Sequence, residues 1–406
     1  MGLGYIGLPT SALLANSGHK VIGVDIHQDV VDTINRGEIH IVEIGLAAFV
    51  SSAVKSAKLS ASLNPSPADI FIIAVPTPFS SSKDHGIPIP NLEYIINATR
   101  EIAPHVVDGN LILLESTSPV GTTLKVQQVL NEERPDLFQN ESKLYFAHCP
   151  ERVLPGRIMI ELVENDRIIG GLTPEASAKT VEFYKTFVEG KILVTDAKTA
   201  EMAKLTENAS RDVGIAFANE LSMICDDENI NVRELIRLAN HHPRVNILQP
   251  GTGVGGHCIA VDPWFIASRN PDKTPLIQTA RRVNLKKTEW VIEQILLKVA
   301  DLTEKLGSIP VVALCGLAFK PDIDDLRESP AKHVAQKLHQ SSKAEWLFVE
   351  PNLNENSSDF TLTSVADVEK TDLIVYLVSH QEFKDMKVSS EELDFCGVFN
   401  DRKVTS

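Results

Sequence analysis

Short apolar runs alternate with helical stretches in the first half of the chain and again near its end, and this alternation limits the fold more than any other feature. The runs at residues 21–26, 69–79, 111–119 and 144–152 are rich in β-branched residues and end near Pro, Asp or Ser, which predicts buried strands. Residues 91–106 have helical spacing. Strands that alternate with helices predict a parallel sheet with helices on both faces.

A helical region separates two such parts of the chain. Residues 198–242 have helical spacing and contain neither a proline nor a strand-like run, and residues 275–306 are also helical in pattern. Apolar runs return at 310–320, 345–351 and 372–378. The sequence therefore predicts an α/β protein in which two Rossmann-like parallel-sheet domains are joined by a helical middle domain. The expected limits are 1–196, 197–306 and 307–406.

The first residues carry the dinucleotide-binding pattern G-x-G-x-x-G at Gly2, Gly4 and Gly7. Such glycines let the backbone turn tightly and approach a pyrophosphate at a helix N-terminus. Asp25 lies 18 residues after Gly7, where a carboxylate holds the ribose hydroxyls of NAD and repels the additional phosphate of NADP. An ordinary glycine turn is the alternative, but the helix, strand and acid that follow favour NAD binding.

A strand ordinarily precedes this glycine pattern, yet only Met1 does so here. The first strand of such a domain lies in the middle of its sheet. We therefore expect its absence to expose both neighbouring strand edges and to leave the glycine loop unanchored. This suggests a misassigned start or a fragment, with weakened cofactor binding.

Residues 251–265, GTGVGGHCIAVDPWF, place Cys258 in a glycine-rich loop. A cysteine acts as a covalent catalyst when it is ionised and when substrate can reach it. We expect Gly253, Gly255 and Gly256 to provide that access. The alternative is a small residue in a tight turn, but the glycines and the nearby acid favour a functional cysteine.

Other side chains could assist this cysteine. The adjacent His257, or a nearby lysine, could favour the thiolate, and Asp262 could orient a lysine or a water molecule. Lys204 and Asn208 are spaced i, i+4 and share a helix face, where they could stabilise an oxyanion or simply form a solvated face. Glu151 follows a strand end, where α/β active sites collect; its alternative is a surface acid in a turn.

NAD together with a reactive cysteine predicts an oxidation through a covalent acyl stage. A thiolate captures an aldehyde as a thiohemiacetal, hydride loss gives a thioester, and water releases an acid. An alcohol oxidised to an acid in this way needs two NAD for each turnover.

Composition excludes several other classes of protein. The net charge of −15 argues against nucleic acid as a partner. No apolar run approaches the roughly 20 residues of a membrane span, and no signal pattern begins the chain, which favours the cytoplasm. The five cysteines are scattered and are expected to be thiols, without a metal site. Residues 80–91 are expected to form a flexible surface loop.

Seven segments match one known family in its order and over nearly the full length: GLGYIGLP, AVPTPF, ESTSPVGTT, CPERVLPG, AEMAKLTENASRD, GVGGHCIAVDP and GLAFKPDIDDLRESP. The chain resembles the nucleotide-sugar 6-dehydrogenases, the UDP-glucose/GDP-mannose dehydrogenase family. The resemblance implies that Cys258 is the nucleophile and that Lys204 and Asn208 steady the oxyanion, with Lys204 also assisting proton transfer. It implies that Asp262 positions Lys204 and the hydrolytic water, and that Glu151 is the base in thioester hydrolysis.

The resemblance also implies two binding sets and an assembly. Long helices of the middle domain would pair two subunits, which implies a homodimer. Lys320, Gly255 and Arg244 would bind the UDP-sugar, Arg244 from a neighbouring subunit. The residues that would hold NAD are Gly2, Gly4, Gly7, Asp25, Thr117 and Arg327.

Within the family, INRGEIHIVE, ERVLPG, HPRVNILQPG and HCIAVDPWF look like the branch that acts on UDP-N-acetyl-D-mannosamine. Ala260 favours this branch over the UDP-N-acetylglucosamine enzymes, which more often continue Ile-Pro. The implied reaction is a four-electron oxidation at C6, with a product used in a bacterial surface glycan such as enterobacterial common antigen. The alternatives are oxidation of UDP-N-acetylglucosamine, UDP-glucose or GDP-mannose, and an inactive truncated chain that only binds nucleotide sugar or a partner subunit.

Overall fold

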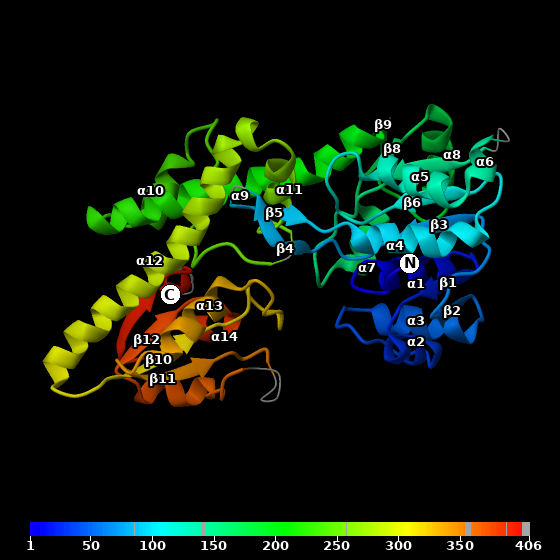
Figure 1. Cartoon of the computed structure of the whole chain (residues 1–406). Helices are drawn as coiled ribbons and strands as arrows, with labels where there is room; N and C mark the ends of the chain where they lie inside the picture. Colours follow the sequence, from blue (N-terminus) through cyan, green and yellow to red (C-terminus); the bar gives the residue numbers. More distant parts are fainter. Residues whose placement is uncertain (85, 140–142, 257, 354–358, 387, 400–406) are drawn as a thin grey trace. The chain divides into compact units, whose positions relative to one another are not determined.

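The computed structural model describes residues 1–399 apart from 85, 140–142, 257, 354–358 and 387. It forms two compact units, the first made of Met1–Glu207 and Trp264–Asn270, the second of Asn208–Pro263 and Pro271–Ser406. Figure 1 shows the helices and strands of both units. Among the residues described, no helix has the length and apolar character needed to cross a membrane.

A five-stranded sheet forms the centre of the first unit. Its order is β3 (Ile70–Ile73), β6 (Leu111–Leu114), β7 (Tyr145–His148), β8 (Arg167–Gly171) and β9 (Ile192–Asp196). Neighbouring strands are parallel except β7 and β8, which are antiparallel. A separate parallel pair is formed by β1 (Val21–Val24) and β2 (Leu59–Ser62). The predicted parallel arrangement is therefore confirmed for β3, β6 and β7, whereas β8 and β9 run in the opposite direction.

Apolar side chains cover both faces of the five-stranded sheet. In β6, Leu111 and Leu113 pack into one core cluster, whereas Ile112 and Leu114 pack into another. This is why the strand reads as a continuous apolar run. The helices of this unit are α1 (Gly7–Asn16), α2 (Gln28–Asn35), α3 (Leu46–Lys55), α4 (Glu93–Ile102), α5 (Thr122–Glu133), α6 (Pro135–Gln139), α7 (Ile158–Glu164) and α8 (Pro174–Tyr184).

The first two residues bridge β1 and β3. The Met1 amino group donates to Ile72 O at 2.8 Å, and the Ala74 amide donates to Met1 O at 2.9 Å. The Gly2 amide donates to Val24 O at 2.8 Å. β1 and β3 nevertheless belong to different sheets. The expectation of an unanchored glycine loop is wrong, because these hydrogen bonds fix its start.

Residues 80–91, expected to be a flexible loop, instead lie in an antiparallel hairpin. It consists of β4 (Phe79–Asp84) and β5 (Ile87–Pro90). Gly86, with φ +78°, adopts the left-handed conformation that tight hairpin turns need. The Asn91 amide donates to Pro78 O at 2.7 Å and closes the base of the hairpin.

The second unit is built on a parallel sheet with the order β11 (Glu345–Val349), β10 (Val311–Cys315), β12 (Leu373–Tyr376) and β13 (Glu391–Asp394). Val312 and Leu314 face one core cluster, and Ala313 and Cys315 face the other. The predicted second Rossmann-like sheet is therefore confirmed. Its helices include α10 (Val232–Ala239), α13 (Pro330–His339) and α14 (Gln381–Lys384).

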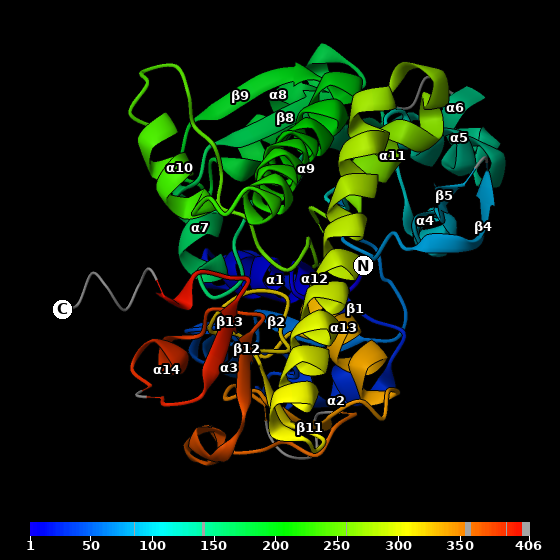
Figure 2. The same cartoon turned by 90° about the vertical axis from the view of Figure 1, so that its left-hand side faces the viewer.

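Three further helices surround the glycine-rich loop in sequence: α9 (Ala197–Asp227), α11 (Asp262–Arg269) and α12 (Pro275–Leu306). In the second unit, α9 and α12 lie against one another (Figure 2), joined by buried polar contacts. Arg281 Nη1 contacts Asp212 Oδ1 at 2.6 Å, and Asn219 Nδ2 donates to Asn284 Oδ1 at 2.9 Å. The middle region is helical, as predicted.

Candidate active site

The N-terminal glycines have the geometry of a pyrophosphate-binding turn. Gly2 has φ +88°, and a Cβ there would lie 2.7 Å from Ala74 O. A Cβ at Gly7, the first residue of α1, would overlap Gly2 O. At Gly4 a Cβ would meet no atom within 4 Å. The outer two glycines thus permit the turn and the close helix packing, whereas Gly4 leaves the backbone open to a ligand.

Asp25 lies beside this turn, immediately after β1. Its Oδ2 accepts from the Leu3 amide at 3.0 Å and its Oδ1 from the His27 amide at 3.1 Å. These bonds fix the carboxylate next to the glycine loop, where the ribose of NAD would lie. Thr117 is half-buried after β6, and its carbonyl accepts from the Thr77 hydroxyl at 2.7 Å. The residues therefore fit an NAD site.

Glu151 lies just beyond β7 and is buried, with 6% of its surface exposed. Its Oε2 contacts Arg167 Nη1 at 2.5 Å, and its Oε1 accepts from the Arg152 amide at 2.6 Å. The alternative of a surface acid in a turn is wrong. The partner, Arg167, was missed from sequence because it lies 16 residues away at the start of β8.

Lys204 and Asn208 lie on α9 and are 9% and 6% exposed. They do not belong to a solvated helix face, because such a face would leave both side chains in water. One turn before Lys204, Glu201 accepts from the Gly121 amide at 2.5 Å and from the Thr123 amide at 2.7 Å. Glu201 thereby ties α9 to the start of α5, a contact between residues 78 apart that sequence analysis missed.

In the second unit, Asn208 Nδ2 donates to Asp262 Oδ2 at 2.5 Å. Asp262 is 2% exposed and begins α11. The Cys258 carbonyl accepts from the Asp262 amide at 2.8 Å and from the Val261 amide at 3.1 Å. The structure therefore brings the predicted nucleophile, Asp262 and the predicted oxyanion donor Asn208 together.

Exposure separates Cys258 from the other cysteines. All five remain thiols, and Cys258 is the one whose residue is exposed. Burial raises the pKa of the Cys149 thiol to about 12, and burial also raises the pKa of Cys396 well above its ordinary value. Because the thiolate is the reactive form, the raised pKa values keep these two thiols protonated and unreactive, which favours Cys258 as the nucleophile.

Gly255 and Gly256 of the cysteine loop pack closely against other residues. A Cβ at Gly255 would overlap Glu328 O and lie 2.6 Å from the Pro330 ring, and one at Gly256 would lie 2.8 Å from the Phe319 ring. Gly256 also has φ +80°. These glycines let the loop press against residues 319–330, and their role in giving substrate access to the exposed Cys258 remains a prediction. His257 lies outside the described residues.

The three basic residues predicted for ligand binding also belong to the second unit. Lys320 is half-buried and Arg244 is exposed after α10. Arg327 Nη2 contacts Asp325 Oδ2 at 2.6 Å and is half-exposed. The roles of these residues and of Gly255 remain predictions.

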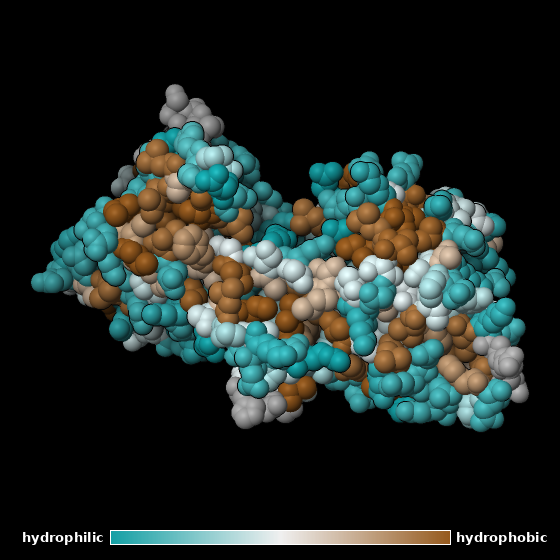
Figure 3. Space-filling view, turned by 90° about the horizontal axis from the view of Figure 1, so that it is seen from above, coloured by the Kyte–Doolittle hydropathy of each residue, from teal (hydrophilic) through white to brown (hydrophobic). Residues whose placement is uncertain are grey.

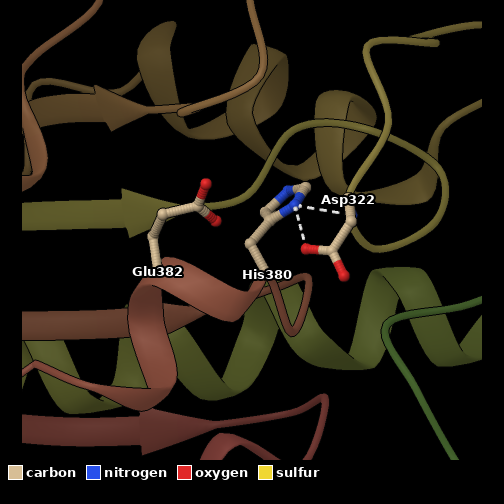
Figure 4. Close-up of side chains that lie close together, drawn as sticks. All are labelled: Asp322, His380 and Glu382. Carbon is tan, nitrogen blue, oxygen red and sulfur yellow. Dashed lines mark hydrogen bonds and ion pairs between the residues drawn. The ribbon is translucent and has the colours of Figure 1, made fainter.

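A cluster of possible metal ligands, Asp322, His380 and Glu382, lies outside this set (Figure 4). His380 is fully buried, and its Nε2 lies 3.0 Å from Glu350 Oε2. Its Nδ1 accepts from the Asp322 amide at 3.0 Å and lies 3.0 Å from Asn352 Nδ2. Both ring nitrogens are thus engaged within the protein, so the histidine has a structural role.

Comparison with known proteins agrees with this fold. Models of the UDP-glucose/GDP-mannose dehydrogenase family match three parts of the chain: the NAD binding domain at residues 1–188, the central domain at 198–286 and the UDP binding domain at 313–399. The chain belongs to this family. It is accordingly an NAD-dependent nucleotide-sugar dehydrogenase, as the resemblance implied.

Three relatives show which branches of the family the chain is similar to. The UDP-N-acetyl-D-mannosamine dehydrogenase of Escherichia coli K12 is 55% identical over 95% of this chain and 93% of its own. An NDP-N-acetyl-D-galactosaminuronic acid dehydrogenase of Ralstonia nicotianae is 50% identical over 100% of this chain and 97% of its own. The solved UDP-D-ManNAc dehydrogenase of Pyrococcus horikoshii is 37% identical, covers 98% of this chain and 94% of its own, and has a TM-score of 0.88.

Proposed function

We propose that this enzyme oxidises UDP-N-acetyl-D-mannosamine at C6 to the corresponding uronate. Relatives that carry the name of this activity support the substrate, at 55% identity for Escherichia coli and 52% for Campylobacter jejuni. The Ralstonia relative supports a second candidate, an N-acetylgalactosamine-type sugar nucleotide. The two sugars differ in configuration at the ring carbons, so a substrate comparison separates them.

The proposed chemistry proceeds through Cys258. The C6 alcohol is first oxidised to an aldehyde, and the Cys258 sulfur then adds to the aldehyde carbon as a thiohemiacetal. A second oxidation leaves a thioester; water adds to it, the carbon–sulfur bond breaks, and the carboxylate and the thiol are released. NAD accepts one hydride in each oxidation, so one substrate, two NAD and one water give the uronate and two NADH.

The observation that carries this mechanism is the exposed Cys258 beside the buried pair of Asp262 and Asn208. Asp262 holds the Asn208 amide so that it can donate to the oxyanion that forms on the substrate carbon. Lys204 adds positive charge and transfers a proton in the first oxidation. Glu151 takes the proton of the water that hydrolyses the thioester.

Ligand binding belongs to the same proposal. Gly2, Gly4, Gly7, Asp25 and Thr117 hold NAD together with Arg327, and Gly255, Lys320 and Arg244 hold the UDP-sugar. The family-model ranges support domain limits near residues 196 and 306.

A homodimer completes the proposal. Exposed apolar side chains lie on the helices of the second unit: Phe217 and Ile224 on α9, Leu238 on α10 and Leu285 on α12. Phe217 and Ile224 are seven residues apart and share a helix face. On the face drawn in Figure 3, hydrophobic residues gather in patches. Pairing of these helices between two copies would cover such side chains.

We place the enzyme in the cytoplasm, in keeping with its five thiols.

The test is the yield of NADH for each UDP-N-acetyl-D-mannosamine consumed. A yield near two, with Cys258→Ala inactive but still binding the sugar nucleotide, supports the proposal. Normal turnover by Cys258→Ala would overturn the mechanism. Faster oxidation of UDP-N-acetylgalactosamine, UDP-N-acetylglucosamine, UDP-glucose or GDP-mannose would show that the substrate is that sugar nucleotide and not UDP-N-acetyl-D-mannosamine.

A further inference from the structure

Glu151 forms a buried ion pair with Arg167, and the proposed reaction does not yet give this arginine a role. Arg167 is 1% exposed, and its Nη1 contacts Glu151 Oε2 at 2.5 Å. Its Nη2 donates to Leu162 O at 2.7 Å. A charge removed from water is stable only when it is paired and hydrogen-bonded. The guanidinium therefore fixes one oxygen of Glu151 in a defined place.

A second carboxylate belongs to the same cluster. Glu115 lies immediately after β6, is 3% exposed and accepts a 2.6 Å hydrogen bond from the Tyr184 hydroxyl at Oε1. The Arg167 guanidinium carbon lies 5.8 Å from the centre of the Tyr184 ring. Among the described residues, Glu115 Oε2 has no hydrogen-bond partner. Tyr184 thus lies between Glu115 and the arginine that pairs with Glu151.

Several neighbouring groups shift the pKa of Glu115. Its pKa is raised to about 7, first by burial and then by the charge of Glu151, although the Tyr184 hydrogen bond, the charge of Arg167 and the Met1 amino group act to lower it. The buried thiol of Cys149 also interacts with this cluster. Near neutral pH, Glu115 therefore changes its charge while Arg167 keeps its own.

We propose that Arg167 is a positioning residue for Glu151, and that Glu115 modulates the pair through its own charge. This inference rests on the proposed role of Glu151 as the base in thioester hydrolysis. With Oε2 held by Arg167 and Oε1 by a backbone amide, the carboxylate has one orientation. An ionised Glu115 adds negative charge near the pair and so favours the transfer of a proton from water to this site.

This role concerns one step of the reaction. Neither of the two oxidations uses Glu151, so a disturbed carboxylate slows hydrolysis and leaves both oxidations intact. The acyl enzyme then accumulates on Cys258 after two NADH have formed at each site. A purely structural role for Arg167 would instead lower every step together.

The experiment compares Arg167→Lys with wild type in rapid-mixing kinetics. Because a small displacement of a catalytic group can slow a reaction on the order of 100-fold, we expect steady-state turnover to fall by about that factor. A burst of about two NADH for each site should precede it, and intact mass should show a thioester on Cys258. The matched control is Arg157→Lys, whose side chain is 60% exposed and which should behave as wild type.

Steady-state turnover of Arg167→Lys within twofold of wild type would overturn the proposal, as would equal losses in burst and steady state. Glu151→Gln separates this from a failure of the proposed function. If Glu151→Gln turns over normally, Glu151 is not the base and both ideas fall. If it accumulates the thioester while Arg167→Lys does not, the positioning role alone is wrong.

Should Arg167→Lys fail to fold, Glu115→Gln provides the second test. Wild-type hydrolysis should accelerate as pH rises through about 7, because Glu115 becomes negative. Glu115→Gln cannot ionise, so this rise should shrink while the burst of NADH is kept. A pH profile identical to that of wild type would overturn the proposal.

Discussion

Asn208 and Asp262 are 54 residues apart in the chain and share a buried hydrogen bond of 2.5 Å. The carboxylate accepts from the amide nitrogen, so it fixes which way the amide hydrogens point. The backbone of Asp262 in turn donates to the Cys258 carbonyl at 2.8 Å. Asp262 therefore orders the donor and the loop of the nucleophile together.

Replacement of Asp262 should uncouple these two groups. We expect Asp262→Asn to lower kcat on the order of 100-fold, the effect of losing one well-placed oxyanion donor, with little change in NAD affinity. Steady-state kinetics and an NAD titration provide the measurement. Asp227→Asn, at the exposed end of α9, is the control. A kcat for Asp262→Asn within threefold of wild type would contradict this account.

The three glycines of the first loop should respond differently to alanine. At Gly4 a Cβ meets nothing within 4 Å, so Gly4→Ala should fold normally but weaken NAD binding, because the methyl group occupies the approach of the pyrophosphate. At Gly7 a Cβ overlaps Gly2 O, so Gly7→Ala should lower the melting temperature as well. Calorimetry of NAD binding and thermal unfolding distinguish the two variants. Equal NAD affinity of Gly4→Ala and wild type would remove Gly4 from the site.

The cysteine loop offers a similar comparison. Gly255→Ala should lower the free energy of unfolding by roughly 1–3 kcal/mol, since the added methyl group overpacks a filled space against Glu328 and Pro330. Gly251→Ala is the matched control, because its nearest atom, Gly253 O, lies 4.0 Å away. Urea unfolding measures both. Equal stability of the two variants would show that the loop does not depend on this packing.

The carboxyl group of Glu115 should leave a signature in the pH dependence of stability. Burial raises its pKa from 4.5 to about 7. Between these values the unfolded chain has lost a proton that the folded protein retains. The free energy of unfolding therefore falls as pH rises from about 4.5 to about 7, by up to about 3 kcal/mol.

Glu115→Gln should lack this fall, so that its stability exceeds that of wild type by more at pH 7 than at pH 5. His148 acts in the opposite direction, because burial lowers its pKa from 6.5 to about 3. It is present in both proteins, and the difference between them isolates Glu115. Chemical denaturation at several pH values gives the measurement, and parallel curves would refute the burial effect.

Sequence patterns predicted the features that depend on local spacing. The strand at 111–114 and the helix at 275–306 follow from runs and periodicity, and Asp25 follows from its distance to Gly7. Sequence analysis missed Arg167, Glu201 and Glu115, because their side chains pair with residues far away in the chain.

The glycines near Cys258 show a second limit. A glycine is required both where a ligand approaches the backbone and where other protein atoms fill the space. The sequence alone does not distinguish these two cases. The hairpin at 79–90 was missed for a related reason: its polar, serine-rich first strand has the composition of a loop.

The close seating of the cysteine loop on residues 319–330 has a consequence for exchanging parts between relatives. Gly255 and Gly256 fit against Phe319 and Pro330, and the two segments belong to one compact unit. A chimera joined at residue 307 would combine the cysteine loop of one parent with residues 319–330 of another, although these two segments pack against each other. A workable exchange must carry both segments together, so the nucleophile and the C-terminal sheet are inherited as a single piece.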